Sequence, residues 1–89
     1  MIRAKEGFIL QKMLDGYMIV SVDDSADAFR GIIRTNETGA FYWKLIEKGI
    51  TTEALVRAAQ ERFEGLDELT ARRDIKEFLE SISLAVETA

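Results

Sequence analysis

The sequence contains no cysteine and no histidine. Without cysteine the chain can form neither a disulfide framework nor a zinc site built on thiolates, and it offers no thiolate nucleophile. Without histidine it lacks the commonest general base and the commonest ligand of transition metals. The carboxylates, lysines and tyrosines that are present show no recognisable catalytic pairing. We therefore expect a binding protein rather than an enzyme, and we expect it to need no metal and no cofactor.

Long apolar runs are also missing. No segment approaches the roughly 18 residues that a membrane-spanning helix needs, and residues 1–16 carry charges where a secretory signal needs its apolar stretch. These features predict a cytoplasmic protein with no membrane partner. The chain has 89 residues, of which 47% are hydrophobic and 31% are charged, and this composition is typical of a globular protein. We expect a single domain over residues 1–89 with one modest core.

An excess of positive charge is the third absence, since the formal net charge is −4. Residues 1–36 contain five basic and five acidic side chains, whereas residues 37–89 contain seven basic and eleven acidic ones. The whole negative excess therefore lies in the second part of the chain. A protein that binds duplex DNA normally neutralises several phosphates with Lys and Arg, so this charge argues against a nucleic-acid partner.

Three strands are predicted in the N-terminal part of the chain. Phe8–Leu14 and Tyr17–Val22 are rich in β-branched and aromatic residues. They flank Asp15-Gly16, a dipeptide that favours a two-residue hairpin turn because it tolerates positive φ. A third run of this kind is Phe29–Thr35. Consecutive strands usually lie side by side, so we predict an antiparallel meander whose two edges are the first and the third strand.

After residue 35 the hydrophobic period changes to that of a helix. Asn36 is a good N-cap and Gly49 a typical helix stop, which predicts a first helix over Glu37–Lys48. Its apolar residues are too many for one helical face, so this helix is expected to contact the sheet on one side and other helices on the other. The apolar residues of this helix are Phe41, Tyr42, Trp43, Leu45 and Ile46. We interpret this aromatic cluster as core packing, because a stacking platform would need exposure and a basic rim.

Two further helices complete the predicted order. Thr51 or Thr52 begins a helix that runs to about Phe63. Asp67 caps a third helix, predicted over Glu68–Ser83. Strands followed by helices indicate an α+β domain, with a three-stranded antiparallel sheet and three helices packed on one of its faces (βββααα).

These segments resemble the PqqD-like proteins. The resemblance is carried by NETGAFYWKLIEKG, TTEALVRAAQERF and DIKEFLESI, within a similarity that extends from about Phe8 to Ile82. Its sharpest part is Asn36–Gly39 together with the aromatic run that ends at Trp43. In our interpretation Asn36–Gly39 is structural: an N-cap followed by a small residue lets the helix start directly from the third strand and pack closely on the sheet. The resemblance implies a winged-helix-like fold that serves as a precursor-peptide recognition element in ribosomal peptide natural-product pathways.

The resemblance also implies a function and a site. The family's role is that of a chaperone-like adaptor, which binds the leader segment of a precursor peptide and presents it to a modifying enzyme. In the namesake pathway this is a radical SAM enzyme that makes pyrroloquinoline quinone. The peptide lies against the third strand and beside the third helix, where an open strand edge offers unpaired backbone groups. The implied peptide-contacting residues are Arg30, Ile32, Ile33, Arg34, Arg72, Lys76 and Leu79. Their basic members would suit a leader peptide that carries acidic residues near its hydrophobic anchors.

Alternatives stay open at this point. Arg72, Arg73 and Lys76 also fit a solvated helix face on which they pair with acidic neighbours. Those neighbours are Glu68, Glu77 and Glu80. A winged-helix transcriptional regulator that binds DNA is a second functional class, which the mixed charges of the third helix disfavour. A structural homodimer that uses the same sheet edge is a third.

Overall fold

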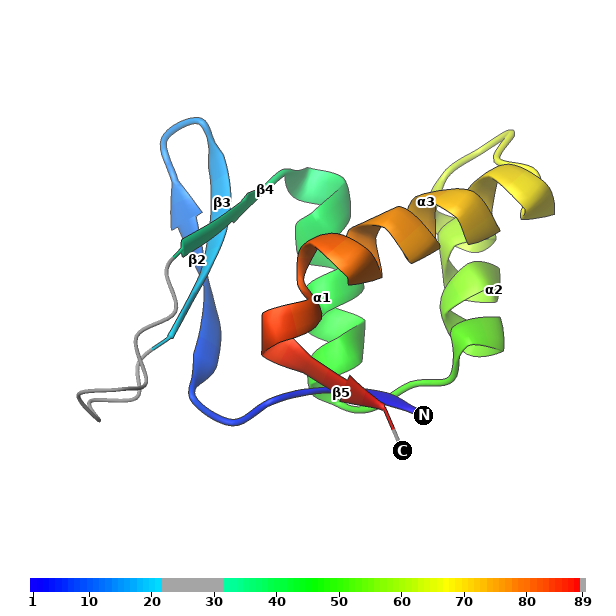
Figure 1. Ribbon diagram of the computed structural model, residues 1–89. Helices are drawn as coiled ribbons and strands as arrows, with labels where there is room; N and C mark the ends of the chain where they lie inside the picture. The colour runs from blue at the N-terminus through cyan, green and yellow to red at the C-terminus, as the bar shows by residue number, and fades with distance from the viewer. Residues whose placement is uncertain (22–31, 89) are drawn as a thin grey trace.

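The computed structural model of the protein describes residues 1–21 and 32–88. An antiparallel sheet contains the strands β2 (Phe8–Met13), β3 (Gly16–Ser21) and β4 (Ile32–Thr35) in the order β2-β3-β4. Three helices follow, and their bounds are Glu37–Glu47 for α1, Thr52–Arg62 for α2 and Glu68–Ser81 for α3. Figure 1 shows the sheet at one side of the molecule, with the helices beside it. The predicted fold, a three-stranded antiparallel sheet followed by three helices, is confirmed.

The hairpin between β2 and β3 lies where it was predicted, but its turn is displaced by one residue. Met13 pairs with Gly16, so the two loop residues are Leu14 and Asp15 rather than Asp15 and Gly16. Gly16 is instead the first residue of β3, with a φ of +155°. A Cβ there would lie 3.2 Å from the carbonyl oxygen of Thr35 in β4. Glycine is therefore favoured at position 16 both by its backbone conformation directly after the turn and by the close approach of β4.

The structure describes the last four residues of the predicted third strand, Ile32–Thr35, as β4. β4 begins at Ile32 and pairs with β3 from Ile32, opposite Val20, to Thr35, opposite Tyr17. The rest of the predicted strand, residues 29–31, lies outside the described residues, as does Val22 of the predicted second strand. The strand order makes β2 and β4 the two edges of the sheet, which confirms the predicted meander.

A second, two-stranded sheet was not predicted. β1 (Ile2–Ala4) pairs antiparallel with β5 (Val86–Thr88), which follows the short 3-10 turn η1 (Ser83–Ala85). The Ile2 N–H also donates a 2.7 Å hydrogen bond to the Ile50 carbonyl, and the Ile50 N–H donates one of 2.9 Å to the Ile2 carbonyl. The two termini therefore lie side by side (Figure 1) and are tied to the turn between α1 and α2. This sheet also ends α3 two residues earlier than predicted, because η1 turns the chain toward β1.

The helix caps follow the predicted chemistry. Asn36 Oδ1 accepts a 2.9 Å hydrogen bond from the Gly39 N–H at the start of α1. At α3, Asp67 Oδ1 accepts one of 2.7 Å from Thr70. Thr51 rather than Thr52 caps α2, since Thr51 Oγ1 accepts a 3.1 Å hydrogen bond from Ala54. These caps fix the positions at which the helices leave the preceding turns. In the described residues, no helix is long and apolar enough to cross a membrane.

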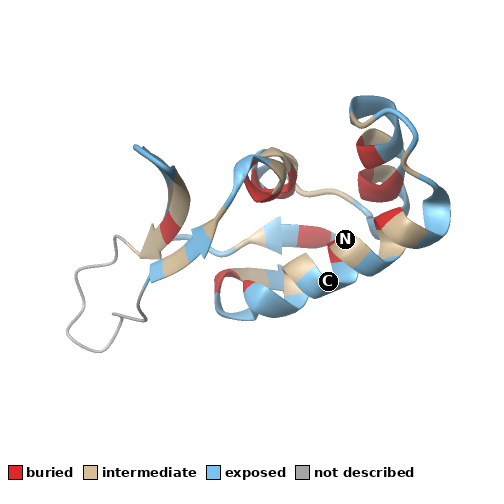
Figure 2. Ribbon diagram, turned by 90° about the horizontal axis from the view of Figure 1, so that it is seen from above, coloured by how far each residue is buried: buried red, intermediate tan, exposed pale blue. Residues whose placement is uncertain are grey.

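Trp43 lies at the centre of the core. Its side chain is 0% exposed, and its indole N–H donates a 2.9 Å hydrogen bond to Glu47 Oε2 one turn further along α1. Ile19 of the sheet, Leu55 of α2 and Ile75 of α3 belong to the same buried cluster. Figure 2 shows buried positions on α1, on α2 and on the sheet. The apolar helix therefore joins the two layers, as its sequence predicted.

Candidate functional site

The β4 strand, α1 and α3 meet at Gly39. A Cβ at this position would overlap the Thr35 hydroxyl oxygen and lie 2.9 Å from Cε1 of Phe78. A side chain larger than hydrogen fits there only if the side chains of Thr35 and Phe78, or the elements that carry them, move. This close approach supports the structural interpretation of residues 36–39: they start α1 directly beside the sheet and bring α3 close to β4.

A hollow of about 600 Å³ opens where these three elements meet, and we call it the strand–helix cleft. β4 and the residue after it contribute one side, the first turns of α1 form the floor, and α3 forms the opposite wall. Its lining residues are Arg34, Thr35, Asn36, Thr38, Gly39, Tyr42, Asp74, Glu77 and Phe78. The cleft thus borders an edge strand, which is where an extended peptide can bind.

The edge of β4 is open along the cleft. In the part of the chain that the structure describes, β4 pairs with β3 only, and Figures 1 and 2 place it on the side of the sheet that faces α3. Ile32 is 57% exposed, Arg34 is exposed, and Ile33 packs against the core cluster. Packing through Ile33 holds the strand in place, while its unpaired N–H and C=O groups remain available.

Tyr42 brings a hydroxyl group to the floor of the cleft. The residue is 2% exposed, and its ring packs on Phe78 with 5.5 Å between the centroids. Its oxygen forms no hydrogen bond with any described residue, and it keeps some contact with solvent, since no buried side-chain oxygen of the described residues lacks a partner. Burial, and secondarily the charge of the Asp74 carboxylate, raises the pKa of Tyr42 above 10.0. The hydroxyl is therefore neutral at ordinary pH and available to a ligand.

The α3 wall of the cleft is acidic. Asp74 and Glu77 both line it, and neither forms a hydrogen bond or an ion pair within residues 1–21 and 32–88. Between them and the core, Phe78 offers an apolar surface. Arg34 supplies positive charge on the strand side. The cleft is therefore polarised, with carboxylates on the helix and a guanidinium on the strand.

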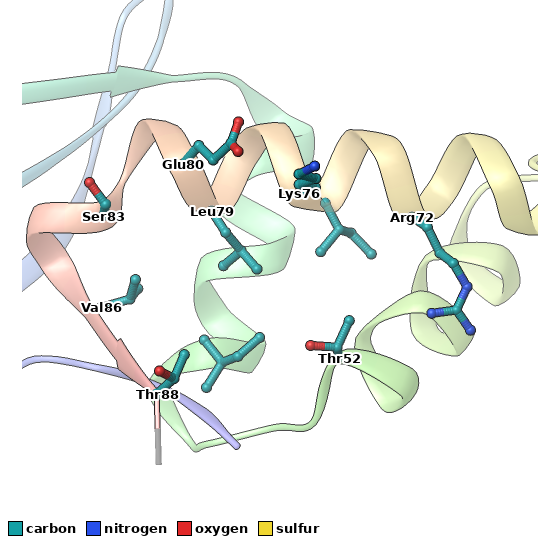
Figure 3. Close-up of a pocket in the computed structure, with 10 residues that line it drawn as sticks. Thr52, Arg72, Lys76, Leu79, Glu80, Ser83, Val86 and Thr88 are labelled. Atoms are coloured by element: carbon teal, nitrogen blue, oxygen red, sulfur yellow. The ribbon is translucent and has the colours of Figure 1, made fainter.

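The predicted α3 residues lie in a different place. Arg72, Lys76 and Leu79 line a second hollow of about 500 Å³, between α3, β1, β5 and the start of α2, which we call the α3–β5 hollow. Figure 3 shows Leu79 pointing into it and Arg72 at its far end beside α2. No residue lines both hollows. The structure therefore does not bring these three residues together with Ile32, Ile33 and Arg34; Arg30 lies outside the described residues.

Helix geometry explains this separation. Successive residues of an α-helix are rotated by about 100°, so positions 72, 76 and 79 fall on one flank of α3, whereas 74, 77 and 78 fall on the opposite flank. Ile75 and Ile82 point between the flanks into the core. The α3 residues predicted from the sequence therefore lie on the flank that faces β5, and their contact with a peptide stays a prediction. The flank that lines the strand–helix cleft is marked in the sequence by Asp74 and Phe78, which lie one helical turn apart.

Arg72 is already held by acidic partners. Its Nη1 and Nη2 donate hydrogen bonds of 2.9 and 2.6 Å to Glu53 of α2, and its Nε donates one of 2.8 Å to Glu68. The hydrogen bond with Glu53 is the main reason that the pKa of Arg72 is raised and that of Glu53 lowered. The predicted pairing with Glu68 is confirmed. Arg73 and Lys76 form no ion pair with any residue that the structure describes.

Within the described ranges, no group of three or more acidic residues is placed to hold a metal ion. The strand–helix cleft offers backbone groups, one hydroxyl, two carboxylates and an aromatic surface. This set is suited to binding a peptide. Fold and cleft together define a small α+β protein with an open strand edge beside a helix.

The comparisons with known proteins agree with this class. The model of the family described as coenzyme PQQ synthesis protein D (PqqD) matches residues 14–83, so the chain belongs to the PqqD family. No curated protein matches the sequence.

Two solved structures share the fold. TbiB1 in complex with the TbiA(beta) leader peptide is 18% identical, with a TM-score of 0.75 over 98% of this chain and 96% of that one. Lasso peptide synthetase B1 complexed with the leader peptide is 13% identical, with a TM-score of 0.72 over 98% of each chain. At these identities the likeness shows a common fold.

Proposed function

We propose that the protein binds the leader segment of a ribosomally made precursor peptide as an added strand on β4. In this role it presents the peptide to a modifying enzyme, such as a radical SAM protein, and performs no chemical step itself. The observation that carries the proposal is the open edge of β4 beside the strand–helix cleft. Membership of the PqqD family and the leader peptides in both similar structures support it.

Strand addition uses the site as follows. Backbone hydrogen bonds to β4 supply affinity, and alternate side chains of the peptide enter the cleft. Ile32 and Arg34 would flank the peptide on the exposed face, and Ile33 would hold the strand on the core. A peptide in this position meets Asp74, Glu77 and Phe78 of α3. Contacts with Arg72, Lys76 and Leu79 stay a prediction, which the experiment below tests separately.

The direct test is an NMR titration of the ¹⁵N-labelled protein with the short precursor peptide encoded beside its gene. We expect amide shifts at Ile32–Thr35 and at residues 74–78. Shifts confined to α1 and α2, with β4 silent, would rule out strand addition. Shifts at Lys76 and Leu79 that exceed those at Asp74 and Phe78 would move the peptide to the α3–β5 hollow.

A pair of matched variants separates the edge from the face of the sheet. Val20 pairs with Ile9 on one side and with Ile32 on the other, so Ile9 and Ile32 share one face at opposite edges. Both are exposed, Ile9 by 43% and Ile32 by 57%. Ile32→Asp should weaken binding by about tenfold or more, because it places a charge where the peptide removes water. Ile9→Asp adds the same charge on the same face and should change affinity less than about twofold. Equal losses in both variants would contradict binding at the β4 edge.

The other functional classes are less well supported. A DNA-binding role would place α3 in a groove, yet Arg72 is held by Glu53 and Glu68, and Asp74 and Glu77 would face phosphates. A homodimer through β4 would use the same edge as the peptide. Sedimentation of the protein with and without the Ile32→Asp change distinguishes this arrangement, since only a dimer would dissociate.

A further inference from the structure

The helix side of the strand–helix cleft holds three polar groups without partners among the described residues. Two are the carboxylates of Asp74 and Glu77, and the third is the hydroxyl of Tyr42. The Tyr42 side chain is almost fully buried, at 2% exposed, and its unpartnered oxygen keeps its remaining contact with solvent at the cleft. A ligand that covers this oxygen and leaves it unpaired therefore removes that contact without replacing it, which costs free energy. Asp74 and Glu77 form no ion pair with any described residue, and Arg34, the basic residue of the cleft, lies on its strand side.

We propose that the bound peptide carries a lysine or arginine on the side that faces α3, held between Asp74, Glu77 and the hydroxyl of Tyr42. This inference rests on the proposed strand addition at β4 and specifies which peptides the cleft accepts. It reverses the sequence-based expectation of an acidic leader, because the basic residues of α3 on which that expectation depended line the α3–β5 hollow instead.

The chemistry of the three groups favours a cation over the alternatives. An ammonium or guanidinium group donates hydrogen bonds to both carboxylates and to the phenol oxygen, which stays neutral because its pKa is raised. A carboxylate from the peptide would accept a bond from Tyr42 but be repelled by Asp74 and Glu77. An apolar side chain would leave the hydroxyl unpaired.

Arg34 and Phe78 define the rest of the preferred pattern. Side chains on one face of a strand repeat about every 6.8 Å, so the next helix-facing position of the peptide falls one step along the cleft. The apolar surface of Phe78 suits an aliphatic or aromatic residue at that position. Arg34 lies on the strand side of the cleft and disfavours a second cation on the face that it shares. The expected peptide therefore has one basic and one apolar residue two positions apart.

A selection experiment tests this pattern and does not require the sequence of the precursor. A displayed library of random 12-residue peptides is selected on the natural protein, on the Asp74→Asn/Glu77→Gln variant, and on the Glu80→Gln control. Glu80 is an exposed glutamate of the same helix that lines the other hollow, and its change alters net charge in the same direction. Peptides selected on the natural protein and on the control should be enriched in Lys or Arg at one position. The enrichment should be lost on the double variant.

The affinities of the selected peptides measure how much the basic residue contributes to binding. Replacing the selected Lys or Arg by Gln should weaken binding to the natural protein by about three- to tenfold, the range for a partly exposed charge-assisted contact. The same replacement should change binding to the double variant by less than about twofold. Tyr42→Phe keeps the ring and removes the hydroxyl. In this variant the Gln replacement should weaken binding by an amount between those for the natural protein and the double variant.

The outcomes separate this inference from the function on which it rests. Selected peptides that shift the β4 amides but show no preference for Lys or Arg overturn the inference and leave strand addition intact. An equal effect of the Gln replacement on the natural protein and the double variant does the same. Peptides that leave the β4 amides silent overturn both proposals.

Discussion

Gly39→Ala sets two physical effects against each other at the junction of β4, α1 and α3. Helix propensity favours alanine by about 0.8 to 1 kcal/mol. The new methyl group would, however, overlap the Thr35 hydroxyl, with Thr35 Cβ at 3.1 Å and Phe78 Cε1 at 2.9 Å. Rotation of Thr35 can move its hydroxyl but not its Cβ, which is fixed to the β4 backbone, and the ring of Phe78 is held against Tyr42.

The steric effect should prevail. Overpacking typically costs about 1 to 3 kcal/mol, and two rigid neighbours place this site in the upper half of that range. After the gain in propensity is subtracted, we expect Gly39→Ala to lower the free energy of unfolding by about 1 to 2 kcal/mol. The strand–helix cleft should change with it, because relief of the overlap moves β4 or α3.

Urea unfolding followed by the fluorescence of Trp43 measures this loss, since Trp43 is the only tryptophan and is fully buried. With a slope of about 1 kcal/mol per molar urea, the midpoint should fall by about 1 to 2 M. The control is a double-mutant cycle with Thr35→Ala, which removes the overlapping hydroxyl. Gly39→Ala should cost about 1 kcal/mol less in that background. A Gly39→Ala protein as stable as the natural one, or a cost unchanged by Thr35→Ala, would refute the argument.

Four other properties follow from the structure. Trp43→Ala should cost about 3 to 5 kcal/mol and Trp43→Phe much less; quenching of Trp43 by acrylamide as readily as free tryptophan would contradict its burial. Because the pKa of Tyr42 is raised above 10.0, its neutral form contributes stability that is present below pH 10.0 and lost as the pH rises through the folded pKa. The natural protein should therefore lose stability above pH 10.0 more steeply than Tyr42→Phe. The hydrogen bond from Thr70 lowers the pKa of Asp67 below 3.8, so its contribution is present above pH 3.8 and lost as the pH falls through the folded pKa. In Asp67→Asn, the free energy of unfolding should therefore fall less steeply below pH 3.8 than in the natural protein. An equally steep fall in both proteins would contradict the role of Asp67 as a charged cap. Excess EDTA should leave the thermal midpoint unchanged, and a shift of several degrees would contradict a fold that needs no metal.

The main elements could be predicted because their signals are local. N-caps at Asn36 and Asp67 act on amides three residues away, and alternation along β4 depends on neighbouring residues only. The sheet of β1 and β5 had no such signal. Each strand has three residues with a charged side chain in the middle, Arg3 and Glu87, and their pairing joins the two ends of the chain. A pairing at that sequence distance leaves no pattern in either segment.

The displaced turn has a similar origin. Asp15-Gly16 looks like a turn because both residues tolerate positive φ, and Gly16 does have a positive φ, but as the first residue of β3. A second reason for glycine comes from Thr35, nineteen positions further along the chain. A glycine needed for a tertiary contact and one needed for a turn look the same in the sequence. Gly39 was interpreted correctly because the cap at Asn36 placed it inside a helix, where glycine is unfavourable unless another element comes close.

The α3 wall of the cleft shows most clearly where sequence reasoning ends. The helix has a buried stripe containing Ala71, Ile75 and Ile82, and the sequence locates that stripe. The stripe has a flank on each side, however, and both flanks carry charged residues beside a large apolar one: Lys76 with Leu79, and Asp74 with Phe78. Which flank faces β4 depends on the direction in which α3 crosses α1, a tertiary property that helical periodicity does not contain. Family resemblance implies a peptide site beside the helix but does not give the direction of the helix. A peptide on the Lys76 flank would be expected to be acidic, whereas one on the Asp74 flank would be expected to carry the basic residue that we propose. The close packing at Gly39 resolves the choice, because only Phe78, and with it Asp74 and Glu77, lies where α3 approaches both Gly39 and the end of β4.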